Sequence, residues 1–155
     1  MEARLRDAQE VLNLKMSGVI RSATAARVEV PDLRSCGSAI AAIVEEIGRE
    51  KDVTIGRTSF RLRNPKNVPP EWAESLVQAK TGEMALFRHE DGRMAALYPL
   101  RTQMGCLKCH GDPEVAPPSL KAKLLARYPQ DESWGFEYPG IRGYIWVETL
   151  PAAQR

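Results

Sequence analysis

The feature that most constrains this chain is a pentapeptide late in the sequence, Cys106-Leu107-Lys108-Cys109-His110. Its C-x-x-C-H pattern is the attachment signature of a c-type haem. The two thiols add across the two vinyl groups of the haem, and the two-residue gap sets the sulfurs at the separation of those vinyls. His110 is then held under the porphyrin and supplies an imidazole to iron. The sequence therefore predicts one covalent haem c per chain and a fold that encloses it.

Two other kinds of site use a C-x-x-C pair. A zinc site needs four ligands, which Cys36, Cys106 and Cys109 would supply together with His89 or His110. A thioredoxin-like dithiol is expected after an early strand and at the start of a helix. Here the motif lies late in the chain, after an apparent hairpin, and a histidine follows it directly. Both observations favour haem.

Length and composition set the class of protein. The chain has 155 residues, enough for one domain with a substantial core. Charged residues make up 27% and apolar residues 43%, and the net charge is +2 with both signs interleaved. This balance gives no electrostatic reason to expect a nucleic acid or a polybasic membrane contact. No apolar run reaches membrane-spanning length, so any membrane anchor is expected only in a removed segment.

The three cysteines and the cofactor together predict a location. If haem takes two cysteines, Cys36 has no partner left for an intramolecular disulfide. Covalent haem attachment in bacteria takes place outside the cytoplasm, so a periplasmic or otherwise extracytoplasmic location is expected. The sequence does not open with a charged segment followed by an apolar one. We therefore expect that a signal or anchor has been removed ahead of Met1.

Apolar periodicity predicts the secondary structure. Residues 1–30 form an N-terminal unit whose apolar residues recur at steps of three and four, which indicates an amphipathic helix. A second helix is expected from Asp32, a suitable N-cap, to about Lys51, with Cys36 on its apolar stripe. The remaining predicted elements are a strand at 53–62, a short helix that starts at 69–71 and ends at Gly82, a hairpin of 83–89 and 93–100 with its turn at Asp91-Gly92, a short helix at 119–127 and a strand at 141–150.

This order of elements predicts an α+β fold. The strands are expected to form a small antiparallel sheet with helices on one face, and the haem to lie between the sheet and the helix of Cys36. Residues 1–30 would be an N-terminal helix and residues 31–150 the haem domain.

The ligand on the other side of the iron has several candidates. They are Cys36, His89 and the methionines, above all Met94 and Met104. Met104 lies only two residues before the first haem-attaching cysteine and is poorly placed to reach the opposite face. A buried free cysteine is usually a small hydrophobe, and strand methionines usually fill the core. Cys36 is favoured because its helical face is apolar and its neighbour Gly37 has no side chain to hold off a flat ring.

Two further groups of residues are candidates for haem contacts. A basic cluster would pair with the haem propionates or simply form a solvated strand face; it consists of Arg57, Arg61, Arg63 and Lys66. Large aromatic residues would line the haem or, more simply, fill the core; these are Trp72, Trp134, Tyr138 and Trp146.

Three blocks of the sequence resemble one known family. They are Gly56 to Pro69, with its R-T-S and R-N-P motifs, Cys106 to Pro113, and Tyr128 to Asp131 followed by Ile141-Arg142-Gly143. They resemble the haem-c-binding PAS-like domains of bacterial sensor proteins and their stand-alone cyanobacterial monohaem relatives, formerly catalogued as a domain of unknown function. The resemblance covers about residues 33–150.

The resemblance implies a fold and a ligand set. It implies a PAS-like, five-stranded antiparallel sheet flanked by helices. It also implies a six-coordinate haem with a histidine on one side and, on the other, a cysteine from the helix before the R-T-S block. The matching positions here are His110 and Cys36, and the resemblance points to both as iron ligands. This chain departs from the family at Ala39-Ile40, where Ala-Pro is frequent.

These observations give two functional hypotheses. The first is a sensory haem domain in which a Cys36 thiolate lowers the redox potential and leaves the reduced iron, so that a diatomic gas such as NO or CO binds. The second is a low-potential electron-transfer cytochrome that meets a redox partner protein. An enzyme such as a peroxidase needs an acid–base residue beside an open site, and with only two histidines we expect none. A dimer through residues 1–30 is a further expectation.

Overall fold

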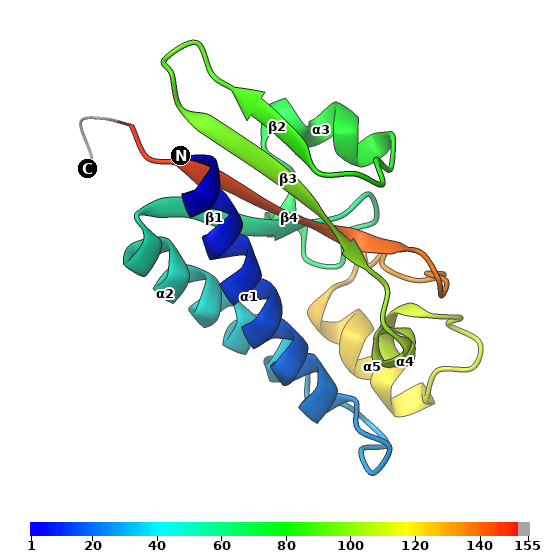
Figure 1. Ribbon diagram of the computed structural model, residues 1–155. Coiled ribbons are helices and arrows are strands. Elements are labelled where there is room, and N and C mark those ends of the chain that lie inside the picture. The colour runs from blue at the N-terminus through cyan, green and yellow to red at the C-terminus, as the bar shows by residue number, and fades with distance from the viewer. Residues whose placement is uncertain (152–155) are drawn as a thin grey trace.

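Four antiparallel strands and the helices on both faces of their sheet make up the fold (Figure 1). The computed structural model describes residues 1–151. The elements are α1 (Glu2–Ala23), α2 (Ile40–Lys51), β1 (Val53–Thr58), α3 (Glu71–Gln78), β2 (Ala85–Arg88), β3 (Met94–Arg101), α4 (Leu107–His110), α5 (Pro118–Arg127) and β4 (Ile141–Thr149). The strand order in the sheet is β1-β4-β3-β2. The predicted α+β class with an N-terminal helix is confirmed.

Both faces of the sheet are covered, so the prediction of helices on one face is wrong. Successive residues of a strand point to opposite faces. Ile145 and Val147 of β4 pack in the core with α1 and α2, whereas Tyr144 and Trp146 pack in a second core with α3. Because β4 carries apolar side chains on both faces, each face needs a helix to cover it.

Helix α1 buries its apolar stripe within the chain. Leu5, Ala8, Leu12 and Met16 are almost fully buried and belong to the core shared with α2 and the sheet. Their spacing of three and four residues confirms the predicted amphipathic helix. No helix in residues 1–151 has both the length and the apolar character that a membrane crossing requires.

The helical segment that carries Cys36 has an irregular first part. Asp32 accepts a hydrogen bond from the Arg34 backbone N–H at 3.0 Å, as an N-cap does. The segment then takes π-helical geometry over Ser35–Ala39 before it continues as α2. π-helical turns are rare and occur frequently at functional sites. Cys36 therefore lies in a backbone segment that is distinct from the regular helix that follows.

The chain leaves the sheet earlier than predicted after β1. The predicted strand at 53–62 ends at Thr58, and residues 1–151 form four strands rather than the five that the resemblance implies. The Ser59 hydroxyl donates to the Arg142 carbonyl and accepts from the Arg61 N–H, which turns the backbone away from the sheet. The other predicted elements lie within a few residues of their predicted positions. They are the hairpin of β2 and β3, the helices α1, α3 and α5, and the final strand β4.

Candidate haem site

A cavity of about 580 Å³ lies where α1, α2, β1, β4 and the haem motif meet. This volume is within the range of small-molecule and cofactor sites. Its wall includes every residue that the sequence analysis assigned to the site, namely Cys36, Arg57, Cys106, Cys109 and His110. Three separate stretches of the sequence therefore contribute to one cavity.

The C-x-x-C-H motif is helical. A short 3-10 turn at Met104–Cys106 leads directly into α4. Cys106 and Cys109 are both buried and stand three residues apart, which places them on one side of the helical turn. Gly111 closes the turn with a hydrogen bond to the Leu107 carbonyl, and a Cβ there would lie only 2.6 Å from that oxygen. The glycine after the motif is thus sterically required.

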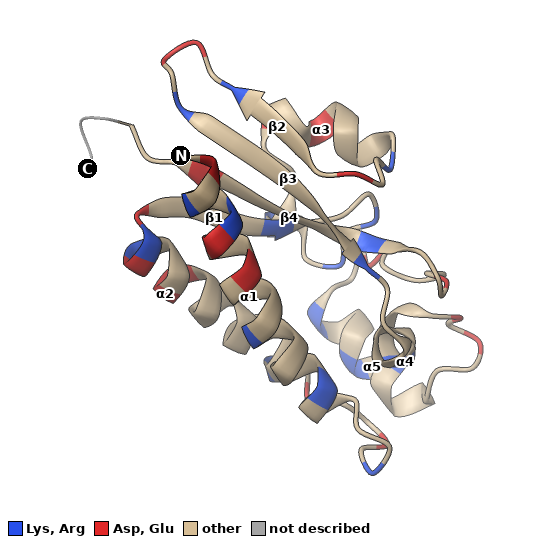
Figure 2. Cartoon of the chain, viewed as in Figure 1, with Lys and Arg blue, Asp and Glu red and all other residues tan. Residues whose placement is uncertain are grey.

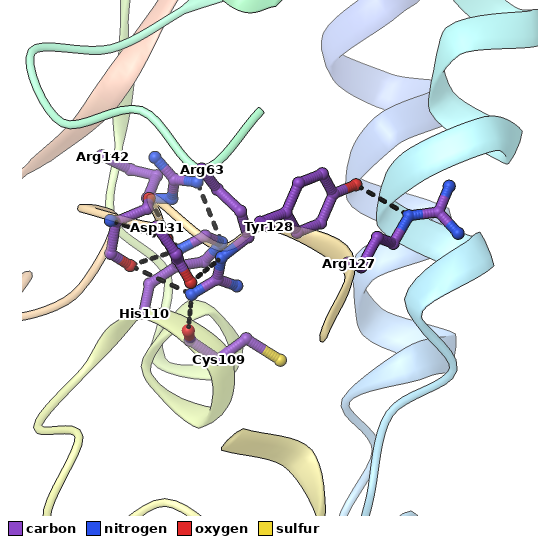
Figure 3. A network of polar contacts seen from close by, with 8 residues as sticks. Arg63, Cys109, His110, Arg127, Tyr128, Asp131 and Arg142 are labelled. Atoms are coloured by element: carbon purple, nitrogen blue, oxygen red, sulfur yellow. Dashed lines mark hydrogen bonds and ion pairs between the residues drawn. The ribbon is translucent and has the colours of Figure 1, made fainter. Parts of the chain in front are cut away.

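His110 is held in one tautomer. Its Nδ1 lies 2.9 Å from the Ser133 carbonyl oxygen, which can only accept, so Nδ1 carries the proton. Nε2 then has a free lone pair, and it accepts from Arg142 Nη2 at 2.9 Å (Figure 3). Burial, followed by the charges of Arg142 and Arg63, holds the pKa of His110 well below its usual range. The imidazole is therefore neutral at pH 7, the form in which histidine binds metals.

Arg142 is a site residue that the sequence analysis missed. Its guanidinium is buried, lies 4.7 Å from the centre of the Phe136 ring and has its pKa lowered by burial to about 10, so it stays charged at pH 7. It faces the nitrogen of His110 that would bind iron, and it must turn aside for a metal to take that position. The only signal for it in the sequence was its place in the Ile141-Arg142-Gly143 block.

Three partly buried arginines in the cavity wall have no carboxylate partner within residues 1–151. They are Arg57, Arg61 and Arg142, whose polar partners are backbone carbonyls or the His110 ring. A buried cation without a counter-charge is costly. The cavity is therefore suited to a ligand that carries negative groups.

Arg63 has a different role from the one predicted. Its Nε lies 2.8 Å from Asp131 Oδ2 in a buried ion pair, and its Nη2 donates to the carbonyls of Cys109 and Ser133 (Figure 3). The guanidinium also lies 5.0 Å from the centre of the Trp134 ring. Arg63 is thus fully engaged by the protein, and it fixes the backbone that orients His110.

Removing this ion pair is expected to destabilise the fold. Arg63→Met leaves the Asp131 carboxylate buried without its partner, which we expect to lower the free energy of unfolding by about 3 kcal/mol. Arg34→Met removes the exposed pair with Asp32 and is the matched control, with little effect expected. Urea unfolding of the two variants measures both. Equal midpoints for the two variants would contradict the role of Arg63.

The Cys36 thiol faces the same charged surroundings. Burial raises its pKa, and the charges of Arg57 and Arg142 partly offset that effect. Arg57 Nη2 also donates to the Cys36 carbonyl at 3.2 Å, so this arginine holds the backbone of the π-helical turn. Burial, with a contribution from Cys36, raises the pKa of Cys109 to about 11. As free thiols in this cavity, both cysteines are protonated at pH 7.

The structure separates the other candidates for the second axial ligand. His89 Nε2 lies 2.7 Å from Glu148 Oε1, Met94 packs against the core of α1 and α2, and the Met104 side chain is 65% exposed. None of these three lines the cavity. Met16 of α1 does line it, and the sequence analysis did not single this residue out. Apart from the two cysteines of the C-x-x-C-H motif, the sulfur-containing residues in the cavity wall are Cys36 and Met16. These two are therefore the sulfur candidates for the second axial ligand.

The remaining sequence candidates divide in the same way. Lys66 and Trp146 line the cavity, whereas Trp72, Trp134 and Tyr138 do not. Tyr128 lines it and was missed. In the described part of the chain no three residues of the types His, Cys, Asp or Glu are grouped to hold a metal ion.

Basic residues gather in the cavity wall although the net charge is only +2. Elsewhere Lys and Arg occur on several elements, among them α1, α2 and α5, and acidic residues mark the turn between β2 and β3 (Figure 2). Lys66 and Arg127 line the cavity together with the arginines named above. The balanced composition therefore conceals a cationic site.

Comparison with known proteins gives two matches. The profile of the Tll0287-like family (Tll0287) matches residues 1–149, so it includes α1, which the sequence blocks left out. The fold is similar to the crystal structure of the cyanobacterial heme-protein Tll0287, with a TM-score of 0.75 and 19% sequence identity over 99% of this chain and 96% of that chain. No curated protein matches. Because the family profile covers nearly the whole sequence, the chain belongs to the Tll0287-like family.

Proposed function

We propose that this chain is a monohaem c-type domain that senses redox state or a diatomic gas. The observation that carries the proposal is the convergence of Cys36, Cys106, Cys109 and His110 on one cavity. The solved structure with the same fold is of a protein described as a heme-protein. In the proposed site, Cys106 and Cys109 form the two thioethers, His110 binds iron through Nε2, and Cys36 is the second axial ligand.

The residues present fit such a group. The Ser133 carbonyl fixes the His110 tautomer, as second-shell partners of metal-bound histidines do. The carboxylates of a haem would give counter-charges to Arg57, Arg61 and Arg142, which have none among residues 1–151. Once Nε2 binds iron, Arg142 loses its present acceptor, and pairing with a haem carboxylate would replace it.

Cys36 gives the site its sensory character. The haem, when bound, supplies one-electron redox chemistry and an axial position for a small ligand. As a thiolate, Cys36 stabilises the ferric state. After one-electron reduction by a cellular reductant, the less positive iron would stabilise the Cys36 thiolate less, so the sulfur would take up one proton from water and withdraw as the thiol. The haem would then offer a place for NO or CO.

The test is CO binding to the reduced protein. We expect dithionite-reduced protein to change its visible spectrum when CO is added, because Cys36 has left the iron. An electron-transfer cytochrome that keeps both ligands would show the same ferrous spectrum with and without CO. That unchanged spectrum, in protein shown by intact mass to carry haem, would reject gas sensing and favour the second function.

The remaining parts of the proposal follow from the cofactor. Haem c maturation requires an extracytoplasmic location, and the partner is a gas or a redox protein rather than a nucleic acid. We expect a non-enzymatic role. In the proposed sensing cycle Cys36 leaves the iron and later returns to it, and no substrate is converted. A dimer through α1 stays a prediction. The apolar stripe of α1 is buried within its own chain, so such a dimer would have to use the other residues of this helix.

A further inference from the structure

Lys108 has contacts that haem attachment does not require. It is one of the two residues between the haem-attaching cysteines. Its Nζ donates to the Ala25 carbonyl at 3.1 Å and to the Val28 carbonyl at 2.5 Å. Both carbonyls belong to the turn that joins α1 to the helical segment of Cys36. One side chain of the attachment motif therefore holds this connection through two charge-assisted hydrogen bonds.

Two neighbouring residues make the same junction tight. A Cβ on Gly105 would lie 2.4 Å from the Thr24 hydroxyl oxygen, so the attachment peptide and the end of α1 are in direct contact. The Gln103 amide lies 3.3 Å from the Ser17 hydroxyl of α1. Together with Lys108, these contacts fix the peptide against α1 and the turn that follows it. We call this set of contacts the α1 latch.

The α1 latch connects the two sides of the proposed haem. His110, the proximal ligand, lies two residues after Lys108. In the other direction the turn at 24–31 leads to Asp32, which caps the segment that carries Cys36. Because the path from the latched turn to Cys36 is short, the latch restricts how far the distal ligand can move from the attachment peptide.

We infer that Lys108 is a positioning residue for Cys36 and sets the affinity of the site for a diatomic ligand. The inference rests on the proposed function, because it requires Cys36 to leave reduced iron before a gas binds. The apparent affinity of such a site is reduced by the rarity of its open form. Lys108 keeps the open form rare by holding the turn, so removing its ammonium group makes the open form more frequent.

The experiment compares CO affinity in the reduced protein for four chains. They are the wild type, Lys108→Met, Lys108→Arg and the control Lys123→Met, which changes an exposed lysine of α5. We expect Lys108→Met to bind CO roughly fivefold to tenfold more tightly than the wild type. Lys108→Arg keeps the charge and the donors and is expected to stay close to the wild type, as is Lys123→Met.

The possible failures are distinguishable. If the wild type binds no CO, the proposed function fails and the inference fails with it. If the wild type binds CO with an affinity that Lys108→Met leaves within twofold, the proposed function stands and the inference alone is rejected. A tighter affinity in Lys123→Met as well would also reject it, since loss of any surface charge would then have the same effect.

A second pair of variants perturbs the α1 latch without touching Lys108, in case Lys108→Met does not mature. Gly105→Ala pushes a methyl group against the Thr24 hydroxyl and displaces the end of α1. We expect this variant to bind CO more tightly, and the double variant with Thr24→Ala to return toward the affinity of Thr24→Ala alone. Wild-type affinity in Gly105→Ala would overturn the inference independently.

Discussion

We expect the double replacement Cys106→Ser with Cys109→Ser to abolish covalent haem attachment in protein matured with a cytochrome c assembly system. Serine is close in size to cysteine, but its hydroxyl does not add across a vinyl group as a thiol does. Cys106 and Cys109 are both buried and both line the cavity. The double replacement removes both thiols, so neither of them is left to form a thioether with the porphyrin. Intact-mass analysis is expected to show bare polypeptide for this variant and polypeptide plus one haem for the wild type.

The control for this prediction is Cys36→Ser. It removes the third cysteine of the cavity, to which the proposed site gives no thioether, and we expect it to keep the full mass of one haem. Bare polypeptide in the wild type, or a covalent haem that survives in the double variant, would contradict the assignment of the thioethers.

The replacement of Cys36 by alanine has the second largest expected effect. In the proposed site, Cys36→Ala would leave covalent attachment intact and remove the thiolate that stabilises ferric iron. We expect the ferric protein to lose its low-spin thiolate spectrum. We also expect the midpoint potential to rise on the order of 100 mV, equivalent to about 2.3 kcal/mol per electron. Electron paramagnetic resonance and a redox titration measure the two effects.

Met16 provides the matched control for this second prediction. It is only 4% exposed and lines the same cavity, so its thioether is the alternative sulfur ligand for the iron. The spectra must therefore distinguish Met16 from Cys36. Met16→Leu keeps the volume and removes the thioether, and we expect its spectrum and potential to match the wild type. A wild-type spectrum in Cys36→Ala combined with an altered one in Met16→Leu would assign the ligand to Met16 instead.

Local sequence signals predicted most of the fold. The apolar spacing of α1, the Asp32 cap and the turn at Asp91-Gly92 each act over a few residues, and each was found where it was predicted. The early end of β1 was missed because it depends on a hydrogen bond from Ser59 to the distant Arg142 carbonyl. Coverage of the second sheet face by α3 was missed because it depends on how strands pair, which periodicity does not reveal.

The same division holds for the candidate site. Cys106, Cys109 and His110 carry a recognisable motif, and Cys36 was found through its helical face and the family resemblance. All four residues line one cavity. Arg142 was missed because its role depends on a contact with His110 that only the folded chain creates. Arg63 was expected either to pair with a haem propionate or to lie on a solvated strand face, and instead it forms a buried ion pair with Asp131.

The measurement that tests the central claim most directly is X-ray absorption at the iron edge of the ferric wild-type protein, with Cys36→Ala as the reference. If Cys36 and His110 bind the iron, the wild type shows nitrogen ligands and one sulfur ligand, and the sulfur signal is absent in Cys36→Ala. A wild-type spectrum with no sulfur, or a sulfur signal that persists in Cys36→Ala, would contradict the proposed ligand pair.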